Sequence, residues 1–219
     1  MNELKKRIII SIIAIPFICL ILYLGSPYLE GLLIILLVGM LWEWFSLNTK
    51  NSRFFKSTLK HLVIFICGTL YIFFAIVFLC QIAHDPFFIL ELLIIVWSTD
   101  VGAYFVGSLL KGPRIAPSIS PKKTWSGFIG GILTAILTTW IPRGYPGIMD
   151  KFHFFPLIII VTLSIAAQIG DLIESSAKRY FKVKDTSQII PGHGGLLDRF
   201  DSLLLVSWIY KLIVVILKI

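Results

Sequence analysis

The chain has 219 residues, of which 57% are hydrophobic and only 15% are charged. Apolar runs of about twenty residues recur along it, which excludes a soluble domain and predicts an integral membrane protein. The formal net charge of +8 would suit a nucleic-acid partner. The Lys and Arg residues instead follow membrane topology, so we expect no nucleic acid.

Seven membrane spans are predicted, which makes the fold class all-α, a polytopic transmembrane helical bundle. Lys5-Lys6-Arg7 before the first run resembles the start of a signal peptide, but no small-x-small cleavage site follows, so we expect a retained span. With the N-terminus in the cytoplasm, all Lys and Arg residues lie on the cytoplasmic side except Arg143, Lys151, Lys211 and Lys218. The spans cover roughly residues 8–24, 28–47, 61–82, 87–109, 124–141, 154–174 and 202–218.

Residues 1–95 form a region of N-terminal membrane spans with few residues suited to chemistry. Trp42, Trp44 and Phe45, near the end of the second span, are typical of an aromatic belt at the membrane interface. Glu43 lies among them, and either a functional role or simple exposure at the interface would explain it; we favour exposure. Residues 96–219 contain the polar clusters that follow.

Asp100 lies deep in the fourth span. A carboxylate at that depth is costly when it faces lipid, so we expect it to face other helices. There it would tune a metal site, pair with a lysine, or form hydrogen bonds between helices. Gly127 and Gly131 in the fifth run form a small-xxx-small pattern, which indicates helix packing.

The segment before the fifth span predicts a helix start, with Ser120 as the N-cap and Pro121 in the first helical position. Backbone N–H groups at such a start bind anions. The side chains of Lys122, Lys123 and Thr124 would complete a phosphate site. Topology marking alone would also explain the two lysines.

The densest cluster of charge runs from Gln168 to Ser202. If the sixth span continues as a helix through Arg179, one helix face carries Asp171, Glu174, Ser175 and Lys178. After a glycine-rich turn, Asp198 and Asp201 lie one helical turn apart at the start of the last span. Oxygen ligands of this kind suit Mg²⁺, and the neighbouring Lys and Arg suit phosphate. The cluster therefore predicts metal-assisted phosphoryl or nucleotidyl transfer.

Three motifs cover about the second half of the chain. They are Ser98-Thr99-Asp100-x-Gly102-Ala103-Tyr104, Ser120-Pro121-Lys122-Lys123-Thr124-Trp125, and Ser175-x2-Lys178-Arg179-x4-Lys184-Asp185-x-Ser187-x2-Ile190-Pro191-x-His193-Gly194-Gly195-Leu196-x-Asp198-Arg199-Phe200-Asp201. The last is long and gapless, and with the others it resembles the signature of the phosphatidate cytidylyltransferases, or CDP-diacylglycerol synthases. One departure is Ala177, where the family has a larger apolar residue.

The resemblance implies that CTP and phosphatidate react to give CDP-diacylglycerol and pyrophosphate at the cytoplasmic side of a bacterial inner membrane, in phospholipid biosynthesis. Residues 96–219 would be the catalytic membrane region. The ionised lipid phosphate is the nucleophile, so no general base is required. The resemblance is compatible with a homodimer, but no residue pattern in the sequence predicts one.

The implied site combines one Mg²⁺ with groups that bind phosphate. Asp171 and Asp198 would hold the ion, and Glu174 and Asp201 would be further ligands of it or of a second cation, monovalent or divalent. The catalytic residues would be Asp171, Asp198, Lys178 and Arg199, with Asp100 in support. Substrate would be bound by Ser120, Lys122, Lys123, Thr124, Ser175, Arg179, Lys184, Asp185, His193, Gly194 and Gly195.

Three other functions would also use a membrane-embedded cluster of charged residues. A CTP-dependent polyprenol kinase would also place acids and bases at a cytoplasmic rim, but it would need a base for its alcohol. A CDP-alcohol phosphotransferase is disfavoured, because its DxxDG pattern is absent from the sequence. A cation or proton transporter would use Asp100, Asp171 and Glu174 as a path, yet the charges gather at one side and no inverted repeat is evident.

Overall fold

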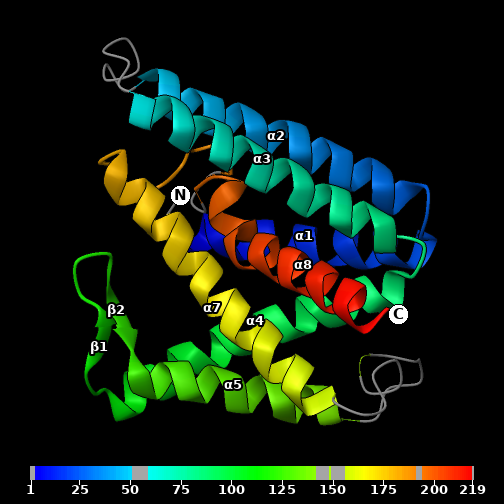
Figure 1. Ribbon diagram of the computed structural model, residues 1–219. Helices are drawn as coiled ribbons and strands as arrows, with labels where there is room; N and C mark the ends of the chain where they lie inside the picture. The colour runs from blue at the N-terminus through cyan, green and yellow to red at the C-terminus, as the bar shows by residue number, and fades with distance from the viewer. Residues whose placement is uncertain (1–2, 51–58, 142–147, 149–155, 191–193, 219) are drawn as a thin grey trace. The chain divides into compact units, whose positions relative to one another are not determined.

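The computed structural model describes residues 3–50, 59–141, 148, 156–190 and 194–218. Within these residues the chain forms long helices and one small hairpin (Figure 1). The elements are α1 (Glu3–Leu24), α2 (Tyr28–Lys50), α3 (Leu59–Ile82), α4 (Pro86–Leu110), β1 (Arg114–Ala116), β2 (Ser120–Thr124), α5 (Trp125–Trp140), α7 (Pro156–Tyr180) and α8 (Leu197–Leu217).

These helices confirm the predicted all-α transmembrane bundle, to which the hairpin adds a two-stranded sheet. Each predicted span falls on one helix. In the part of the chain that the structure describes, α2, α3, α4, α7 and α8 are long and apolar enough to cross a bilayer, and the apolar segments Ile12–Leu24 and Trp125–Trp140 are shorter. Large side chains such as Ile35 and Leu137 remain about two-thirds exposed, an arrangement that suits lipid better than water.

Contacts along the chain define two compact units. Unit 1 comprises Met1–Pro86 and Ala177–Phe200, and unit 2 comprises Phe87–Ser176 and Asp201–Ile219. Both boundaries fall inside helices, so α7 and α8 each contribute residues to both units. The predicted division into residues 1–95 and 96–219 concerns roles rather than packing, and it stays a prediction.

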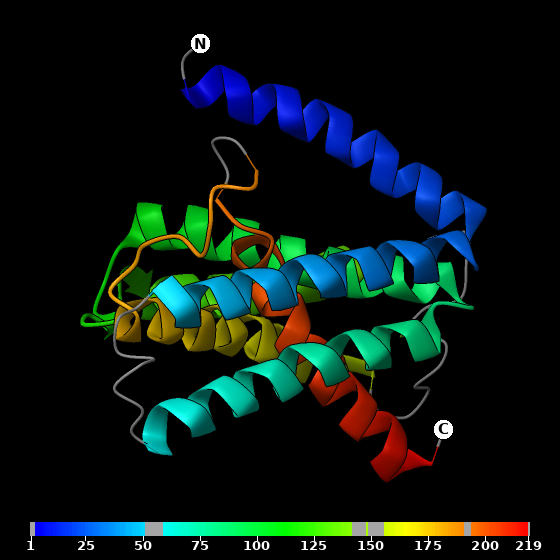
Figure 2. The same ribbon diagram turned by 90° about the horizontal axis from the view of Figure 1, so that it is seen from above.

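In unit 1, α2 and α3 run antiparallel and side by side (Figures 1 and 2). They approach closely at Gly68, where a Cβ atom would lie 2.2 Å from Cζ2 of Trp44. The Trp44 side chain is buried, and its Nε1 donates to the carbonyl of Phe65 at 3.1 Å. The prediction that Trp44 belongs to an interfacial belt is therefore wrong, because it packs between helices. Trp42 and Phe45 are more than half exposed, as such a belt requires.

In unit 2, the hairpin of β1 and β2 joins α4 to α5 (Figure 1). The predicted helix start at Ser120 is wrong, because Ser120 pairs with Ala116 in the antiparallel ladder. The helix begins at Trp125 instead. Thr124 is its N-cap, and its Oγ1 accepts a hydrogen bond from the backbone N–H of Gly127 at 3.2 Å.

Glycines bring α4 and α5 together. A Cβ at Gly127 would lie 2.6 Å from the carbonyl oxygen of Ala103, and one at Gly131 would lie 2.8 Å from that of Thr99. Larger residues would push the helices apart at both positions. The packing role predicted for this glycine pair is confirmed.

Candidate active site

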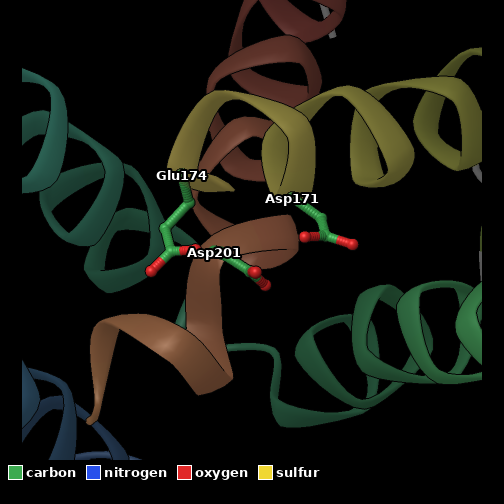
Figure 3. Close-up of side chains that lie close together, drawn as sticks. All are labelled: Asp171, Glu174 and Asp201. Atoms are coloured by element: carbon green, nitrogen blue, oxygen red, sulfur yellow. The ribbon is translucent and has the colours of Figure 1, made fainter. Parts of the chain in front are cut away.

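Three carboxylates converge in unit 2. Asp171 and Glu174 come from α7 and Asp201 from α8, and one oxygen of each lies within 4.8 Å of the others. Figure 3 shows the three side chains directed toward a common space. All three residues are partly buried. Each of them is among the metal ligands predicted from the sequence, and the structure brings these three together.

Helix geometry accounts for the cluster. Asp171 and Glu174 lie three residues apart on α7, so they share one face. Gly170 lets α8 approach that face closely, since a Cβ there would lie 2.8 Å from the carbonyl oxygen of Asp201 and 3.1 Å from Cα of Ser202. The glycine therefore brings the carboxylate of Asp201 near the other two.

The cluster carries a large repulsive energy when its acids are ionised. Two unit charges 4.8 Å apart repel by about 3 kcal/mol at an effective dielectric constant near 20. A nearby cation offsets that repulsion. One such cation is Lys123, whose Nζ lies 2.7 Å from Oδ2 of Asp171 and donates to the carbonyl of Gln168 at 3.0 Å.

The donor set fits a hard divalent cation. Mg²⁺ takes oxygen ligands at about 2.1 Å, so two ligands of one ion lie about 3 to 4.2 Å apart. The carboxylate oxygens lie up to 4.8 Å apart, which is about 0.6 Å more than the largest distance between two ligands of one Mg²⁺ ion. Small side-chain rotations can close that difference. Asp171, Glu174 and Asp201 are thus able to hold Mg²⁺.

A cavity of about 300 Å³ adjoins this cluster within unit 2. The hairpin lines it with the two lysines of its second strand, while α4 and α7 contribute carboxylates. Several of the predicted residues meet there, namely Asp100, Ser120, Lys122, Lys123, Thr124 and Asp171. A concave site with cations on one wall and acids on the other is suited to a phosphate-bearing ligand and its metal.

Ser175 supports the acidic cluster. It is buried, and its Oγ donates to Oδ1 of Asp171 at 3.2 Å. With Lys123 on Oδ2, both oxygens of Asp171 have a partner. These bonds fix the orientation of the carboxylate, and the predicted role of Ser175 in substrate binding stays a prediction.

Unit 1 contains a second polar centre, around Asp198. Lys178 Nζ lies 2.7 Å from Oδ1 of Asp198, whose side chain is only 5% exposed. The other oxygen, Oδ2, accepts from the backbone N–H and the hydroxyl of Thr186 and from the N–H of Gly195, all within 2.9 Å. Asp198 is therefore engaged by four bonds.

The end of α7 directs the chain toward this centre. Lys182 has a φ of 57°, the N–H of Val183 donates to the carbonyl of Lys178, and the N–H of Lys182 donates to that of Arg179. This is the Schellman pattern that ends a helix with one left-handed residue. The motif reverses the direction of the chain after α7, which brings Thr186 within hydrogen-bond distance of Asp198.

Most of the remaining predicted residues are exposed to solvent. Arg179, Lys184, Asp185 and Arg199 are exposed, and Gly194 adopts a φ of 86° beside Asp198. His193 lies outside the described residues. Asp171 and Asp198 belong to different units, so the predicted sharing of one ion by these two stays a prediction.

Two contributors, Gln168 and Glu43, were not among the predicted site residues. Gln168 bridges within unit 2, because its carbonyl accepts from Lys123 and its Nε2 donates to the carbonyl of Phe128 at 3.2 Å. Glu43 was expected to be exposed at the membrane interface, but it is fully buried and accepts hydrogen bonds from the segment around Thr186 and from the start of α8. A glutamate between two tryptophans in an apolar run was the only available signal.

Comparison with known proteins agrees with this geometry. The model of the cytidylyltransferase family matches residues 55–217. A phosphatidate cytidylyltransferase of Rickettsia bellii is 38% identical over 218 residues, which covers 94% of this chain and 88% of the relative. That of Rickettsia conorii is 33% identical over 95% of this chain and 90% of the relative. That of Bacillus subtilis is 47% identical over 113 residues, or 52% of this chain and 42% of the relative.

The family match covers most of the chain, and the Rickettsia bellii relative aligns along nearly its whole length. The match includes the hairpin, the acidic cluster and the centre around Asp198. The chain belongs to the cytidylyltransferase family and is a membrane-embedded nucleotidyltransferase.

Proposed function

We propose that this chain transfers the cytidylyl group of CTP to phosphatidate, giving CDP-diacylglycerol and pyrophosphate. The observation that carries the proposal is the cavity of unit 2, which Lys122, Lys123 and Asp171 line and in which Lys123 pairs with Asp171. Its relatives are named for this activity. The basic residues at this end of the helices favour the cytoplasmic side of a bacterial membrane, where a soluble nucleotide meets a lipid headgroup.

In the proposed reaction, a non-bridging oxygen of the phosphatidate phosphate attacks the α-phosphorus of CTP. A new P–O bond forms as the bond between the α-phosphorus and the β-bridging oxygen breaks, and pyrophosphate leaves with that electron pair. The nucleophile is already an anion near neutral pH, so no side chain has to remove a proton. The chief obstacle is repulsion between two anions.

The residues of the cavity address that repulsion. Lys122 and Lys123 supply positive charge beside the site of attack, and Thr124 fixes the junction between the hairpin and α5. Lys123 can exchange Asp171 for a substrate phosphate, because both are anionic partners for one ammonium group. Asp171, Glu174 and Asp201 would hold Mg²⁺, which supplies charge neutralisation at the phosphates when bound.

The proposal is tested with purified chain in detergent, phosphatidate and CTP labelled at the α-phosphate. We expect labelled CDP-lipid and an equal amount of pyrophosphate, both dependent on Mg²⁺. A CTP analogue with a methylene group between the α- and β-phosphorus should give neither product. Failure to label lipid at saturating CTP and phosphatidate would refute the assignment. Release of CDP with a phosphorylated polyprenol would indicate a kinase, and ion flux without nucleotide turnover would indicate a transporter.

A further inference from the structure

Glu43 on α2 is a fully buried glutamate in unit 1. It lies more than 140 residues before the chain segments that its carboxylate contacts. A buried acid is costly unless hydrogen bonds satisfy its oxygens. Glu43 has such bonds on both oxygens, so its burial is part of a built arrangement.

Four donors converge on this carboxylate. The hydroxyl of Ser187 donates to Oε1 at 2.5 Å, and that of Thr186 lies 3.2 Å from Oε2. The backbone N–H groups of Leu196 and Leu197 donate to Oε1 and Oε2 at 2.8 and 2.9 Å. Oε1 therefore bonds to the loop that follows α7 and to the start of α8. Oε2 bonds to the start of α8 and shares the single proton of the Thr186 hydroxyl with Asp198.

The bonds to Leu196 and Leu197 resemble a helix cap supplied from a distant helix. The first N–H groups of α8 have no acceptor within their own helix, and an acid there also interacts favourably with the helix dipole. Glu43 thus fixes where α8 begins. Asp198 follows in the first turn of that helix.

The same bonds connect Glu43 to the centre around Asp198. The Thr186 hydroxyl lies within hydrogen-bond distance of both Glu43 and Asp198. Gly195 sits between them, and a Cβ there would lie 2.0 Å from Oγ1 of Thr186 and 2.7 Å from both oxygens of Glu43. The loop after α7 and the start of α8 therefore pack closely around the side chain of Glu43.

We propose that Glu43 is a positioning residue that holds the loop after α7 and the first turn of α8, and with them Asp198, in the arrangement that turnover requires. The catalytic part of this inference rests on the proposed function. Nothing in it requires Glu43 to contact substrate. Its contribution is to orient other groups through the four donors.

Glu43→Gln is the diagnostic substitution, because it keeps the shape of the side chain but replaces one acceptor oxygen with an NH₂ donor. Either orientation of the amide turns that NH₂ group toward one hydroxyl and one backbone N–H. The backbone N–H cannot rotate away or become an acceptor, so it loses its partner. Leaving a buried donor without a partner is disruptive, and we expect kcat to fall by about tenfold or more.

Hydrogen exchange separates positioning from general destabilisation. In Glu43→Gln, amides in residues 183–190 and 194–200 should exchange about tenfold faster, while those of α4 and α5 are unchanged. Glu91→Gln is the matched control. Glu91 is also a buried glutamate, in α4, and its Oε2 accepts from the N–H of Ile148 at 2.6 Å. We expect that control to leave both exchange in those segments and kcat within twofold of wild type.

Ser187→Ala provides a second test, which stands on its own if Glu43→Gln folds poorly and completes a double-mutant cycle if it folds. Ser187→Ala removes one donor to Glu43 and also the acceptor of the Ile189 N–H, with little change in volume. It should lower kcat moderately and accelerate exchange in residues 194–200, which Ser187 reaches through Glu43. If Ser187 acts through Glu43, the double variant should be no slower than Glu43→Gln alone. Multiplicative effects on kcat, or a kcat of Glu43→Gln within twofold of wild type, would overturn the inference.

The inference is also overturned if the amides of residues 183–190 and 194–200 remain protected from hydrogen exchange in Glu43→Gln. A wild-type chain that makes no CDP-lipid would instead refute the proposed function. The exchange comparison would still decide whether Glu43 holds the loop, so the two failures are distinguishable.

Discussion

Gly170→Ala tests whether close packing of α7 on α8 sets the spacing of the carboxylate cluster. The new Cβ would meet the carbonyl oxygen of Asp201 at 2.8 Å, whereas ordinary contact begins at 3.4 Å, so the α8 backbone must move by about 0.6 Å. Side-chain rotation is already needed to bring these ligands to one ion, so a further backbone shift would exceed the tolerance of about 0.2 Å on metal–ligand distances. We therefore expect the Mg²⁺ concentration for half-maximal turnover to rise by about ten- to a hundredfold.

Stability should change little in the same variant. Replacing a helical glycine with alanine gains about 1 kcal/mol in helix propensity, while overpacking costs about 1–3 kcal/mol. These opposing effects leave a small net loss of unfolding free energy. The titration of CDP-lipid formation with Mg²⁺ is therefore the informative measurement, and thermal unfolding in detergent is its companion.

Gly31→Ala is the matched control, because nothing lies within 4 Å of the Cβ position at Gly31 in α2. It should gain up to about 1 kcal/mol of stability and keep the wild-type response to Mg²⁺. A folded Gly170→Ala variant whose half-maximal Mg²⁺ concentration stays within twofold of wild type would refute the proposed link between helix spacing and metal binding.

Three shorter predictions concern the same site. Asp201→Asn should lower turnover by about a hundredfold or more while the protein elutes normally in gel filtration, since it removes a charged ligand from the cluster; near-normal turnover would contradict the assignment. Lys123→Met should raise KM for CTP by about tenfold, because Asp171 and the cavity lose a cation; an unchanged KM would place the nucleotide elsewhere. Chelation with EDTA should abolish turnover and lower the Tm of wild type, and Mg²⁺ should restore both. In Asp171→Asn the Tm should not respond to Mg²⁺, and an equal response would exclude the cluster as the binding site.

Hydropathy was sufficient to predict the helices, because spans in a bilayer must satisfy their backbone groups internally and so appear as long apolar runs. The hairpin was missed for a related reason. Its strands have only three and five residues, too short for an alternating pattern to develop, and Ser120-Pro121 also matches a helix cap. Local cap chemistry competed with pairing to Ala116, and the pairing prevailed.

The acidic cluster was partly predictable, because Asp171 and Glu174 must share a face of any helix that contains them. Their proximity to Asp201 depends on how α7 packs against α8, which Gly170 permits and which no local pattern encodes. Glu43 was misjudged for the same reason. Its neighbours in sequence are aromatic, whereas its partners lie more than 140 residues away, so only tertiary structure reveals its burial.

Asp198 and Asp201 lie one turn apart on α8, yet their surroundings give them different chemistry. Asp198 is surrounded by donors, namely Lys178, Thr186 and Gly195, which already satisfy its oxygens. Asp201 accepts a hydrogen bond from the N–H of Ser202 at 2.6 Å, and one of its oxygens also lies within 4.8 Å of oxygens of Asp171 and Glu174. A carboxylate held by several donors is suited to organising the chain, and one grouped with other carboxylates is suited to recruiting a metal. On these contacts, Asp201 is placed to act with Asp171 and Glu174 on an ion, and Asp198 is placed to hold the loop in shape.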